Sequence, residues 1–552
     1  MKKPRYDLLI RSRTAPESTN AHRNRLVPVL RAIVRELTVE GATFAAGSIA
    51  HDGSEGRSPR VAGLGFTPAS VVDARMDEYD LVVIGGGSGS QVATAAAERG
   101  LEAAVIERGP LGGACITRGC VPSKALIHRA DIAESARRAE SFGVDAALEG
   151  IDYGEMTAAI HDTVYEKADR QEASLEDAEN VALYRGEGRF VDERTLEVDL
   201  NDGGDAEVRG DDVVLAVGSR PIVPPIDGLE DADFLTSDDA LFLDERPDSL
   251  VVVGGGYIGA ELGYFFAAVG TDVSIVGRSE RLVPREDEAV GEVVTESLER
   301  YCDVYTGYEA AEIGENDSGV VVTAEPSEDD TDGDGVDLEA DDLLLATGRR
   351  PNTDTLNLEA TGVETDDGEY VVVDDRLETS CDGVWALGDI VGEQPFKHAA
   401  DYEAKTVSAN LLEDADRAVD YGAMPHAVFT EPQVASVGRT EGELEDDGRE
   451  YESTTVPFDA APLGMIMNAD DGFVKVLAAP DGEILGCHIV GPQASTLIQE
   501  IVTAMDGGGT VDDVAEPVHV HPALSEVVYA AFDDLSSSEF STAPDWRDVG
   551  DG

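Results

Sequence analysis

The chain has 552 residues, which is too many for one hydrophobic core and predicts about three folded domains. Asp and Glu number 113 against 41 Lys and Arg, and the net charge of −72 argues against nucleic-acid binding, which requires a basic face. The acid is spread along the chain, as is typical of a surface adapted to a high-salt cytoplasm; an acidic partner-binding surface is the alternative. No apolar run reaches the ~18 residues of a membrane span and no secretory signal is evident, so we expect a cytoplasmic protein.

The first 75 residues differ in charge from the rest of the chain. Residues 1–75 hold 12 Lys and Arg against 7 Asp and Glu, a net charge of +5, and the remainder carries −77. Met76 follows directly, and the first clear strand begins at Tyr79. We interpret 1–75 as an extraneous or disordered N-terminal extension, with Met76 as the natural start. A genuine basic arm or small extra domain is the alternative.

The first element with a functional pattern is a strand, glycine loop and helix that begins at Tyr79. Gly85 and Gly87 allow the chain to turn tightly and approach a pyrophosphate, which the amides at the helix N-terminus can bind. The third position of this pattern is Ser90 instead of glycine. Glu107 ends the next expected strand, where an acid can bind ribose hydroxyls. These features in register predict a dinucleotide site.

A pair of cysteines, Cys115 and Cys120, follows this unit. In an ideal helix, residues five apart have Cα atoms ~8 Å apart, which exceeds the ~7 Å limit for a disulfide. The segment must therefore be distorted if the two cysteines pair, and Gly119 permits a distortion. Zinc is the competing use, but no second Cys/His pair has suitable spacing, so we predict no metal. Two unrelated buried cysteines remain the alternative.

A second strand–loop–helix unit carries the complete glycine pattern Gly254, Gly256 and Gly259. Its second strand ends without an acid at the ribose position, and Arg278 and Arg281 follow instead. Arginine can bind a 2′-phosphate, so the pattern favours NADPH over NADH. Surface arginines with no role in binding are the alternative.

Three features lie downstream of the second unit. The acidic stretch 325–342 predicts a hairpin loop between strands, and residues 423–530 predict an α+β domain without a nucleotide loop. In the segment His519-Val-His-Pro-Ala-Leu-Ser-Glu526, His521 lies five residues before Glu526. Such a pair is suited to act as a base and its orienting partner in thiol chemistry.

Residues 77–532 resemble the class I pyridine nucleotide–disulfide oxidoreductase family. The motifs are the two glycine loops, Gly-Gly-x-Cys-x4-Cys-Val-Pro-Ser-Lys, Ala346-Thr-Gly-Arg-Arg-Pro-Asn, Ala386-Leu-Gly-Asp389 and His-x-His-Pro-x-x-Ser-Glu. The resemblance implies an α/β fold of two Rossmann-like dinucleotide-binding domains, for FAD and NAD(P), plus a C-terminal α+β dimerisation domain. The implied boundaries are 76–223 and 346–422 for the two parts of the FAD domain, 224–345 for the NAD(P)H domain, 423–532 for dimerisation, and 533–552 for an acidic tail.

The resemblance also implies roles for single residues. Cys120 lies next to the flavin and Cys115 exchanges with substrate. Lys124 lies near the flavin and pairs with Glu261, whereas Tyr257 gates the nicotinamide pocket. Further cofactor contacts are implied at Asp389, Gly113, Gly188, Gly218 and Gly348. His521 and Glu526 reach the active site of the other subunit, which implies a homodimer. One departure is Ala114, where most relatives have threonine.

The implied activity is NADPH-dependent reduction of a small-molecule disulfide through FAD. Residues 491–500 and Lys397-His398 resemble mycothione reductase, and we favour bis-γ-glutamylcystine as the substrate. Dihydrolipoamide dehydrogenase is the main alternative. Mercuric reductase is a weaker one, because such relatives have a C-terminal cysteine pair and this chain has no cysteine after Cys487. A flavin-dependent electron-transfer component of a larger assembly is an alternative from a different class.

Overall fold

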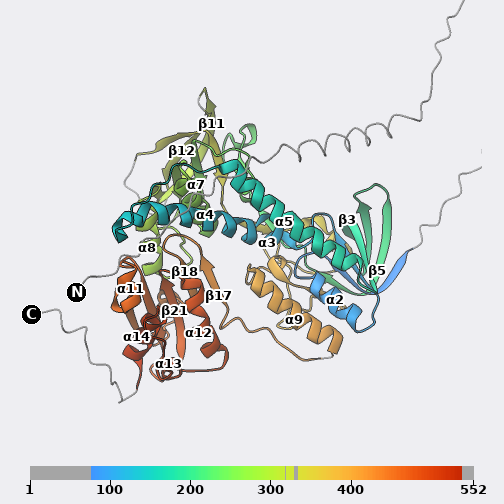
Figure 1. Cartoon of the computed structure of the whole chain (residues 1–552). Helices are drawn as coiled ribbons and strands as arrows, with labels where there is room; N and C mark the ends of the chain where they lie inside the picture. The colour runs from blue at the N-terminus through green and yellow to red at the C-terminus, as the bar shows by residue number, and fades with distance from the viewer. Residues whose placement is uncertain (1–75, 318, 328–333, 414, 538–552) are drawn as a thin grey trace, which may run out of the picture. The chain divides into compact units, whose positions relative to one another are not determined.

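The computed structural model describes residues 76–317, 319–327, 334–413 and 415–537 (Figure 1). The expected N-terminal extension, the middle of the acidic loop and most of the acidic tail lie outside the described residues. None of the helices in the described ranges combines the length and the apolar character that crossing a bilayer requires. Three main sheets organise the described chain.

The first sheet has six strands and contains the first glycine loop. Its strands are β1 (Asp77–Ile84), β2 (Ala103–Glu107), β3 (Val181–Asp192), β4 (Thr195–Leu200), β5 (Asp205–Leu215) and β16 (Val384–Ala386). β1 lies parallel to both β2 and β5, and β16 joins the sheet beside β5. The apolar run at the end of β1 is fully buried, as expected for a strand between two parallel neighbours. Helices α2 (Ser90–Glu98) and α9 (Lys397–Glu413) pack together beside this sheet.

The second sheet is entirely parallel and contains the second glycine loop. In order across the sheet, its strands are β10 (Asp303–Thr306), β9 (Asp272–Gly277), β8 (Ser249–Val253), β14 (Asp342–Leu345) and β7 (Leu235–Thr236). Helix α7 (Tyr257–Val269) follows β8, and α8 (Glu288–Leu298) follows β9. The antiparallel strands β11 (Tyr308–Asn316), β12 (Gly319–Pro326) and β13 (Val336–Ala340) form a smaller sheet. The expected hairpin loop therefore lies between β12 and β13, and it is shorter than expected because β13 takes up part of the stretch.

The third sheet is antiparallel and belongs to the C-terminal part of the chain. Its strands, in order, are β17 (Pro425–Val428), β18 (Val434–Gly438), β21 (Ile484–Val490), β20 (Phe473–Ala478) and β19 (Glu452–Pro457). Helix α12 (Ala494–Asp506) packs on β18 and β21, and α14 (Ser525–Leu535) packs on β19 and β20. These two helices supply apolar residues to one buried cluster with the sheet. The α+β architecture predicted for this region is confirmed.

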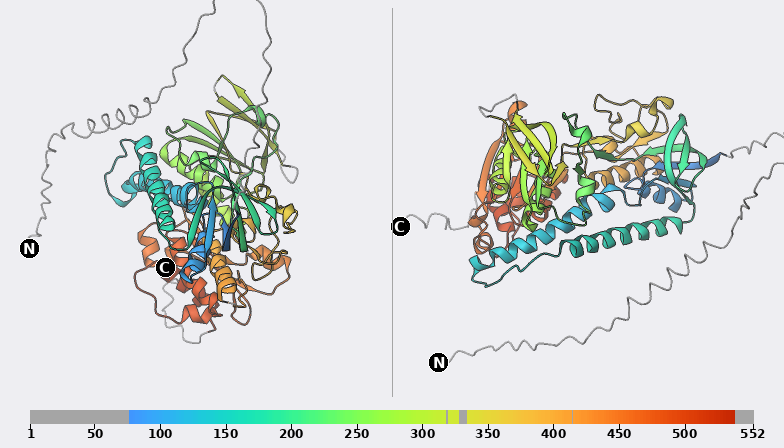
Figure 2. Two further views of the ribbon diagram at one scale, coloured as in Figure 1. Left: turned by 90° about the vertical axis from the view of Figure 1, so that its right-hand side faces the viewer. Right: turned by 90° about the horizontal axis from the view of Figure 1, so that it is seen from above.

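Helices α3 (Gly113–Arg118) and α4 (Cys120–Arg138) carry the two cysteines, and helix α5 (Tyr153–Glu176) follows them in the chain. Helices α4 and α5 pack side by side, and α4 also packs against α7 of the second sheet (Figure 2). The remaining short elements are β6 (Ser219–Pro221) paired with β15 (Arg349–Pro351), α6 (Ser237–Ala240), α10 (Glu441–Asp446), α11 (Pro462–Ile466) and α13 (Val511–Ala515).

A buried ion pair joins the second sheet's α8 to the third sheet. The Nζ atom of Lys475, in β20, lies 2.7 Å from Asp287 Oδ1 and 2.7 Å from Glu441 Oε2. Asp287 precedes α8, and its side chain has no exposed surface. Its second oxygen accepts a hydrogen bond from the backbone N–H of Glu441. Asp287 is therefore stable as a carboxylate only while Lys475 is in place.

We predict that Lys475→Met destabilises the protein by about 3 kcal/mol, because it leaves the Asp287 carboxylate buried without a cation. The measurement is the urea unfolding midpoint at constant high salt. Lys405→Met, at an exposed lysine of α9, is the matched control and should leave the midpoint unchanged. An unchanged midpoint for Lys475→Met would show that the pair does not stabilise the fold.

Candidate active site

The two glycine loops share one geometric constraint. Gly85 has φ +115°, and a Cβ atom there would lie 2.2 Å from the carbonyl oxygen of Ala216, just past the end of β5. Gly254 has φ +129°, and a Cβ atom would lie 2.2 Å from the carbonyl oxygen of Ala346, just past β14. Each loop thus turns directly against the chain leaving the neighbouring parallel strand, which only glycine allows. This repeated geometry supports the prediction of two dinucleotide sites.

The third position of the first loop is arranged differently from the sequence pattern. The Ser90 hydroxyl donates a 2.8 Å hydrogen bond to the carbonyl oxygen of Gly87 at the start of α2. The close approach between helix and strand occurs at Gly89, where a Cβ atom would lie 2.9 Å from Val83 Cγ1. In the second loop, Gly259 makes the expected close approach. The sequence pattern missed Gly89, although a glycine directly before Ser90 was a visible signal.

Glu107 lies where the sequence predicted a ribose-binding acid. It ends β2, and its two carboxylate oxygens accept 2.6 Å hydrogen bonds from the backbone N–H groups of Gly86 and Gly109. These bonds fix the carboxylate beside the first glycine loop, and each oxygen keeps a free lone pair for a hydroxyl donor. The first loop and Glu107 therefore fit the adenosine end of FAD.

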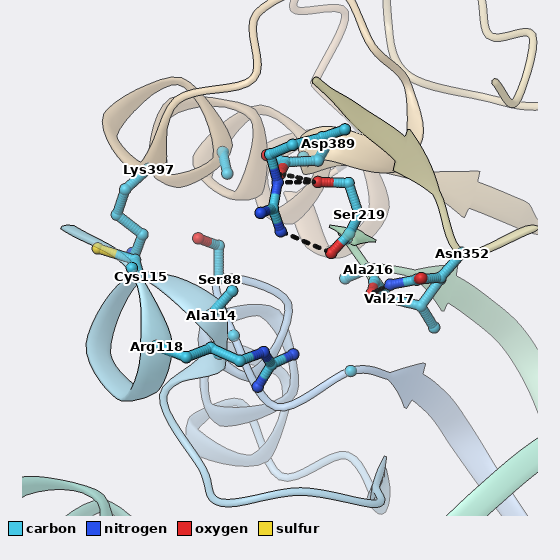
Figure 3. Close-up of a pocket in the computed structure, with 18 of the residues that line it drawn as sticks. Ser88, Ala114, Cys115, Arg118, Ala216, Val217, Ser219, Asn352, Asp389 and Lys397 are labelled. Atoms are coloured by element: carbon cyan, nitrogen blue, oxygen red, sulfur yellow. Dashed lines mark hydrogen bonds and ion pairs between the residues drawn. The ribbon is translucent and has the colours of Figure 1, made fainter. Parts of the chain in front are cut away.

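One cavity is lined both by residues of this loop and by the two cysteines, and Figure 3 shows Ser88 of the loop near Ala114 and Cys115. The predicted site residues that line it are Gly85, Gly87, Glu107, Gly113, Cys115, Cys120, Lys124, Gly188, Gly218, Tyr257, Glu261 and Asp389. They come from three separate stretches of the sequence. A glycine loop and a pair of thiols in one cavity match a nucleotide-linked redox group such as FAD.

The cysteine segment is distorted at the predicted position. Helix α3 ends at Arg118 and α4 begins at Cys120, so Gly119 separates two helices. A Cβ atom at Gly119 would lie 2.9 Å from the carbonyl oxygen of Ala114. Both thiols are free in this structure, and a hydrogen bond between their side chains brings them together. The expected distortion at Gly119 is observed, whereas a disulfide between the two cysteines remains a prediction.

The two thiols have different acidities because of their surroundings. The hydrogen bond from Cys115 and the positive charge of Lys124 together lower the pKa of Cys120 to about 7, against the effect of burial. The same hydrogen bond, together with burial, raises the pKa of Cys115. The first proton is therefore lost from Cys120, while Cys115 keeps its own.

Lys124 and Glu261 form the ion pair that the sequence predicted. Lys124 Nζ, in α4, donates a 2.6 Å hydrogen bond to Glu261 Oε2, in α7. The other oxygen of Glu261 accepts a 2.9 Å hydrogen bond from the backbone N–H of Phe429, and Lys124 lies 4.9 Å from the centroid of the Phe429 ring. The cation thus lies beside Cys120, held by two other parts of the chain.

Asp389 is held by partners that the sequence did not reveal. Its Oδ2 atom accepts a 2.5 Å hydrogen bond from the Ser219 hydroxyl, and the Arg349 guanidinium donates to the same hydroxyl (Figure 3). The backbone N–H of Gly388 donates to the fully buried carboxylate of Glu403, which fixes the turn before Asp389. Arg349 belongs to the Ala-Thr-Gly-Arg-Arg-Pro-Asn motif, so the sequence did offer a signal that this residue belongs to the site. No motif or spacing indicated Glu403.

Arg118, between the two cysteines, also lines this cavity. Its guanidinium forms an ion pair with Asp238 of α6 at 3.0 Å between Nε and Oδ2. The side chain is therefore engaged within the chain and does not extend freely into solvent. This pair joins the cysteine segment to the stretch that leads into the second sheet.

A second, larger cleft lies along the second glycine loop. The predicted residues that line it are Gly254, Gly256, Tyr257, Arg278, Arg281 and Gly348. A Cβ atom at Gly256 would meet no atom within 4 Å, which leaves open space for a phosphate to approach the backbone. Arg281 forms an ion pair with Glu288, whereas Arg278 has no ion pair among the described residues. Tyr257 lines both cavities, so it lies where the two sites meet.

His521 and Glu526 form a pair away from the cysteine cavity. His521 Nδ1 lies 2.8 Å from Glu526 Oε1, and the other oxygen of Glu526 accepts a hydrogen bond from the backbone N–H of Ala523. The His521 side chain is 68% exposed, and it does not line the cavity that holds the cysteines. The glutamate can fix the ring tautomer and leave Nε2 for a partner. The prediction that this pair serves the other subunit remains a prediction.

The comparisons with known proteins match this geometry. Residues 79–422 match the pyridine nucleotide-disulphide oxidoreductase family, and residues 424–532 match its dimerisation domain. The chain therefore belongs to the pyridine nucleotide–disulfide oxidoreductases. Members of this family are FAD-dependent enzymes that use a pyridine nucleotide, and the dimerisation domain supports a homodimer.

Individual relatives are similar over most of their length. The chain is 36% identical to dihydrolipoyl dehydrogenase 3 of Haloarcula marismortui, covering 82% of this chain and 95% of the relative. It is 33% identical to a mercuric reductase of Staphylococcus aureus, covering 82% of each. Among solved structures, the flavoprotein disulfide reductase RclA of Escherichia coli aligns with a TM-score of 0.74 and 27% identity, covering 84% of this chain and 100% of that one. The haloarchaeal relative agrees with the salt adaptation inferred from the acidic composition.

We predict that Lys124→Gln raises the pKa of Cys120 above about 7, because the substitution removes the cation beside the thiolate. The measurement is a pH titration of thiolate ultraviolet absorbance in the reduced holoenzyme. Lys167→Gln, at an exposed lysine of α5, controls for the loss of one positive charge. An unchanged titration in Lys124→Gln would mean that this cation does not set the acidity of the pair.

Proposed function

We propose that the protein is an NADPH-dependent flavoprotein reductase of a small-molecule disulfide, acting in the cytoplasm. The observation that carries this proposal is one cavity lined both by the first dinucleotide loop and by Cys115 and Cys120. When bound, FAD would carry electrons from the nucleotide cleft to the cysteine pair. Gly85, Gly87 and Glu107 would hold its adenosine end.

The chemistry of the cysteines is a thiol–disulfide exchange. His521 of the partner subunit takes the proton of Cys115, and the resulting thiolate attacks one sulfur of the substrate disulfide. This forms a mixed disulfide and releases one thiolate, which takes that proton back from His521 of the partner subunit. The Cys120 thiolate then attacks the sulfur of Cys115, which forms the Cys115–Cys120 disulfide and releases the second substrate thiolate, which takes a proton from solvent. Two electrons have passed from the dithiol to the substrate, and bound FAD would supply the two electrons from NADPH that restore the dithiol.

The choice of nucleotide follows from the second cleft. Arg278 follows the strand at whose end an acid would bind the ribose of NADH, and it has no ion pair within the described chain. A guanidinium in this position can pair with the 2′-phosphate of NADPH. Arg281 lies in the same cleft, but Glu288 already balances its charge. We therefore assign the main contact with the phosphate to Arg278.

The substrate we propose is bis-γ-glutamylcystine. Its support is the resemblance of residues 491–500 and of Lys397-His398 to mycothione reductase, together with the absence of cysteine after Cys487. The second candidate function is that of a dihydrolipoyl dehydrogenase, which the names of the haloarchaeal relatives favour. That enzyme runs the exchange in the opposite direction, from a dithiol to the nucleotide.

One assay separates these candidates. Purified holoenzyme in high salt is given NADPH or NADH with bis-γ-glutamylcystine, lipoamide or Hg²⁺, and nucleotide oxidation is measured. Fastest turnover of bis-γ-glutamylcystine with NADPH is the expected result, and Cys115→Ser should abolish it while FAD stays bound. Preference for lipoamide with the NAD couple would replace this proposal with the second candidate, and full activity of Cys115→Ser would overturn the role of the pair.

We predict that Arg278→Ala raises KM for NADPH about tenfold or more and leaves KM for NADH unchanged, because only NADPH carries the 2′-phosphate. Steady-state kinetics with both nucleotides provides the measurement. Arg300→Ala removes an exposed arginine of the same part of the chain that does not line the cleft, so it should change neither KM. Equal loss with both nucleotides would assign Arg278 to general binding instead of phosphate recognition.

A further inference from the structure

A different lysine lies near each of the two redox cysteines. Lys124, paired with Glu261, lies beside Cys120. Lys397, the first residue of α9, lines the same cavity as Cys115, and Figure 3 shows its side chain extending from α9 toward that cysteine. The chain contains only seven lysines in 552 residues. Two of these seven lysines, Lys124 and Lys397, therefore line the cavity that contains the redox cysteines.

Lys397 is fixed in place by a carboxylate. It forms an ion pair with Asp401, one turn further along α9. The Oδ1 atom of Asp401 also accepts hydrogen bonds from Ser88 Oγ at 2.9 Å and from Gln91 Nε2 at 2.5 Å. Ser88 belongs to the first glycine loop and Gln91 to α2. The lysine is thus held relative to the loop, while an ammonium group has three donors and keeps two of them for other contacts.

The charges at Cys115 oppose one another. The hydrogen bond to Cys120, burial, and the negative charges of Cys120 and Asp401 all raise the pKa of the Cys115 thiol, and the positive charge of Lys397 lowers it. Cys115 must nevertheless form a thiolate to attack a disulfide, because the thiol is a poor nucleophile. Lys397 is the cation that supports this step from within the same chain.

We propose that Lys397 is a positioning residue that increases the thiolate fraction of Cys115, and that Asp401 limits the size of this effect. The arrangement repeats that of Lys124 and Glu261 at Cys120. This inference rests on the proposed role of Cys115 in exchange with substrate. It does not depend on which disulfide is the substrate.

The other charged groups near Cys115 are accounted for. Cys120 faces it from α4, and Lys397 and Asp401 face it from α9. Arg118 shares its helix, but this arginine is paired with Asp238. His521 is expected from the second subunit, and it is the same in every variant compared below. Differences between variants at Lys397 and Asp401 therefore report these two charges.

The test is the pH dependence of Cys115 alkylation in the holoenzyme. Cys120→Ser in every protein removes the coupling between the thiols, and mass spectrometry of the Cys115 peptide after brief iodoacetamide treatment gives the rate at each pH. Lys397→Gln should raise the midpoint of this profile by about one pH unit, because a nearby cation is lost. Asp401→Asn should lower the midpoint, because the opposing negative charge is lost. Lys397→Arg keeps the charge and should restore the original profile.

A purely structural role would give a different result. Loss of the contact between α9 and α2 would move the Lys397→Gln and Asp401→Asn profiles in the same direction, and either this outcome or two unchanged midpoints would overturn the proposal. Lys405→Gln, on the same helix but exposed, should leave the profile unchanged. Flavin absorbance checks that FAD stays bound; if Lys397→Gln loses FAD, the Asp401→Asn shift alone decides. Alkylation needs no turnover, so an inactive wild-type enzyme would overturn the proposed function and not this inference.

Discussion

The carboxylate of Glu261 holds together the parts of the chain between which electrons must pass. It lies in α7 of the second sheet, binds Lys124 of the cysteine-bearing helix α4, and accepts a hydrogen bond from the backbone of Phe429 next to the third sheet. A buried carboxylate costs several kcal/mol of desolvation unless charge and hydrogen bonds offset it. Displacement of Lys124 would leave that charge without a cation, and displacement of the Phe429 N–H would remove one of its hydrogen bonds. The flavin cavity, the nucleotide cleft and the C-terminal sheet are therefore fixed to one another at the redox centre.

The extreme acidity of the chain makes such short-range pairs decisive. A net charge of −72 disfavours every additional negative charge, including the thiolates that the chemistry needs. At molar salt the Debye length is about 3 Å, so distant acids are screened and only groups in contact still act. Lys124 lies one helical turn from Cys120 in α4, and Lys397 lines the same cavity as Cys115. Exposed ion pairs elsewhere on the surface contribute little under these conditions.

The sequence predicted those features that depend on local spacing or on a motif. The turn at Gly85, the acid at Glu107 and the break at Gly119 each follow from neighbouring residues, and the pairing of Lys124 with Glu261 followed from the family resemblance. Contacts between distant residues without a motif were missed. Asp401 lies 313 residues from Ser88, to which it is hydrogen-bonded, and nothing in the spacing of either residue indicates the contact.

One local detail of the first loop differs from the complete glycine pattern for a physical reason. The glycine pattern assigns the close helix–strand contact to the third position, which is Ser90 here. In the structure the helix approaches the strand at Gly89, and Ser90 instead satisfies the carbonyl oxygen of Gly87. A pattern of residue types fixes which conformations are possible, whereas the packing of α2 on the strand determines which glycine is needed.

The two candidate activities use the same dithiol in opposite directions, so the cysteine centre alone does not distinguish them. The distinction lies in the second cleft. A 2′-phosphate brings negative charge to a protein that already carries −72. Because high salt screens distant charges, the protein can recognise this phosphate mainly through groups in direct contact with it. Arg278 is a cation in that cleft without an ion pair in the described chain, whereas Arg281 beside it is neutralised by Glu288. The lack of an ion pair at Arg278 within the described residues is therefore what supports the proposed preference for NADPH.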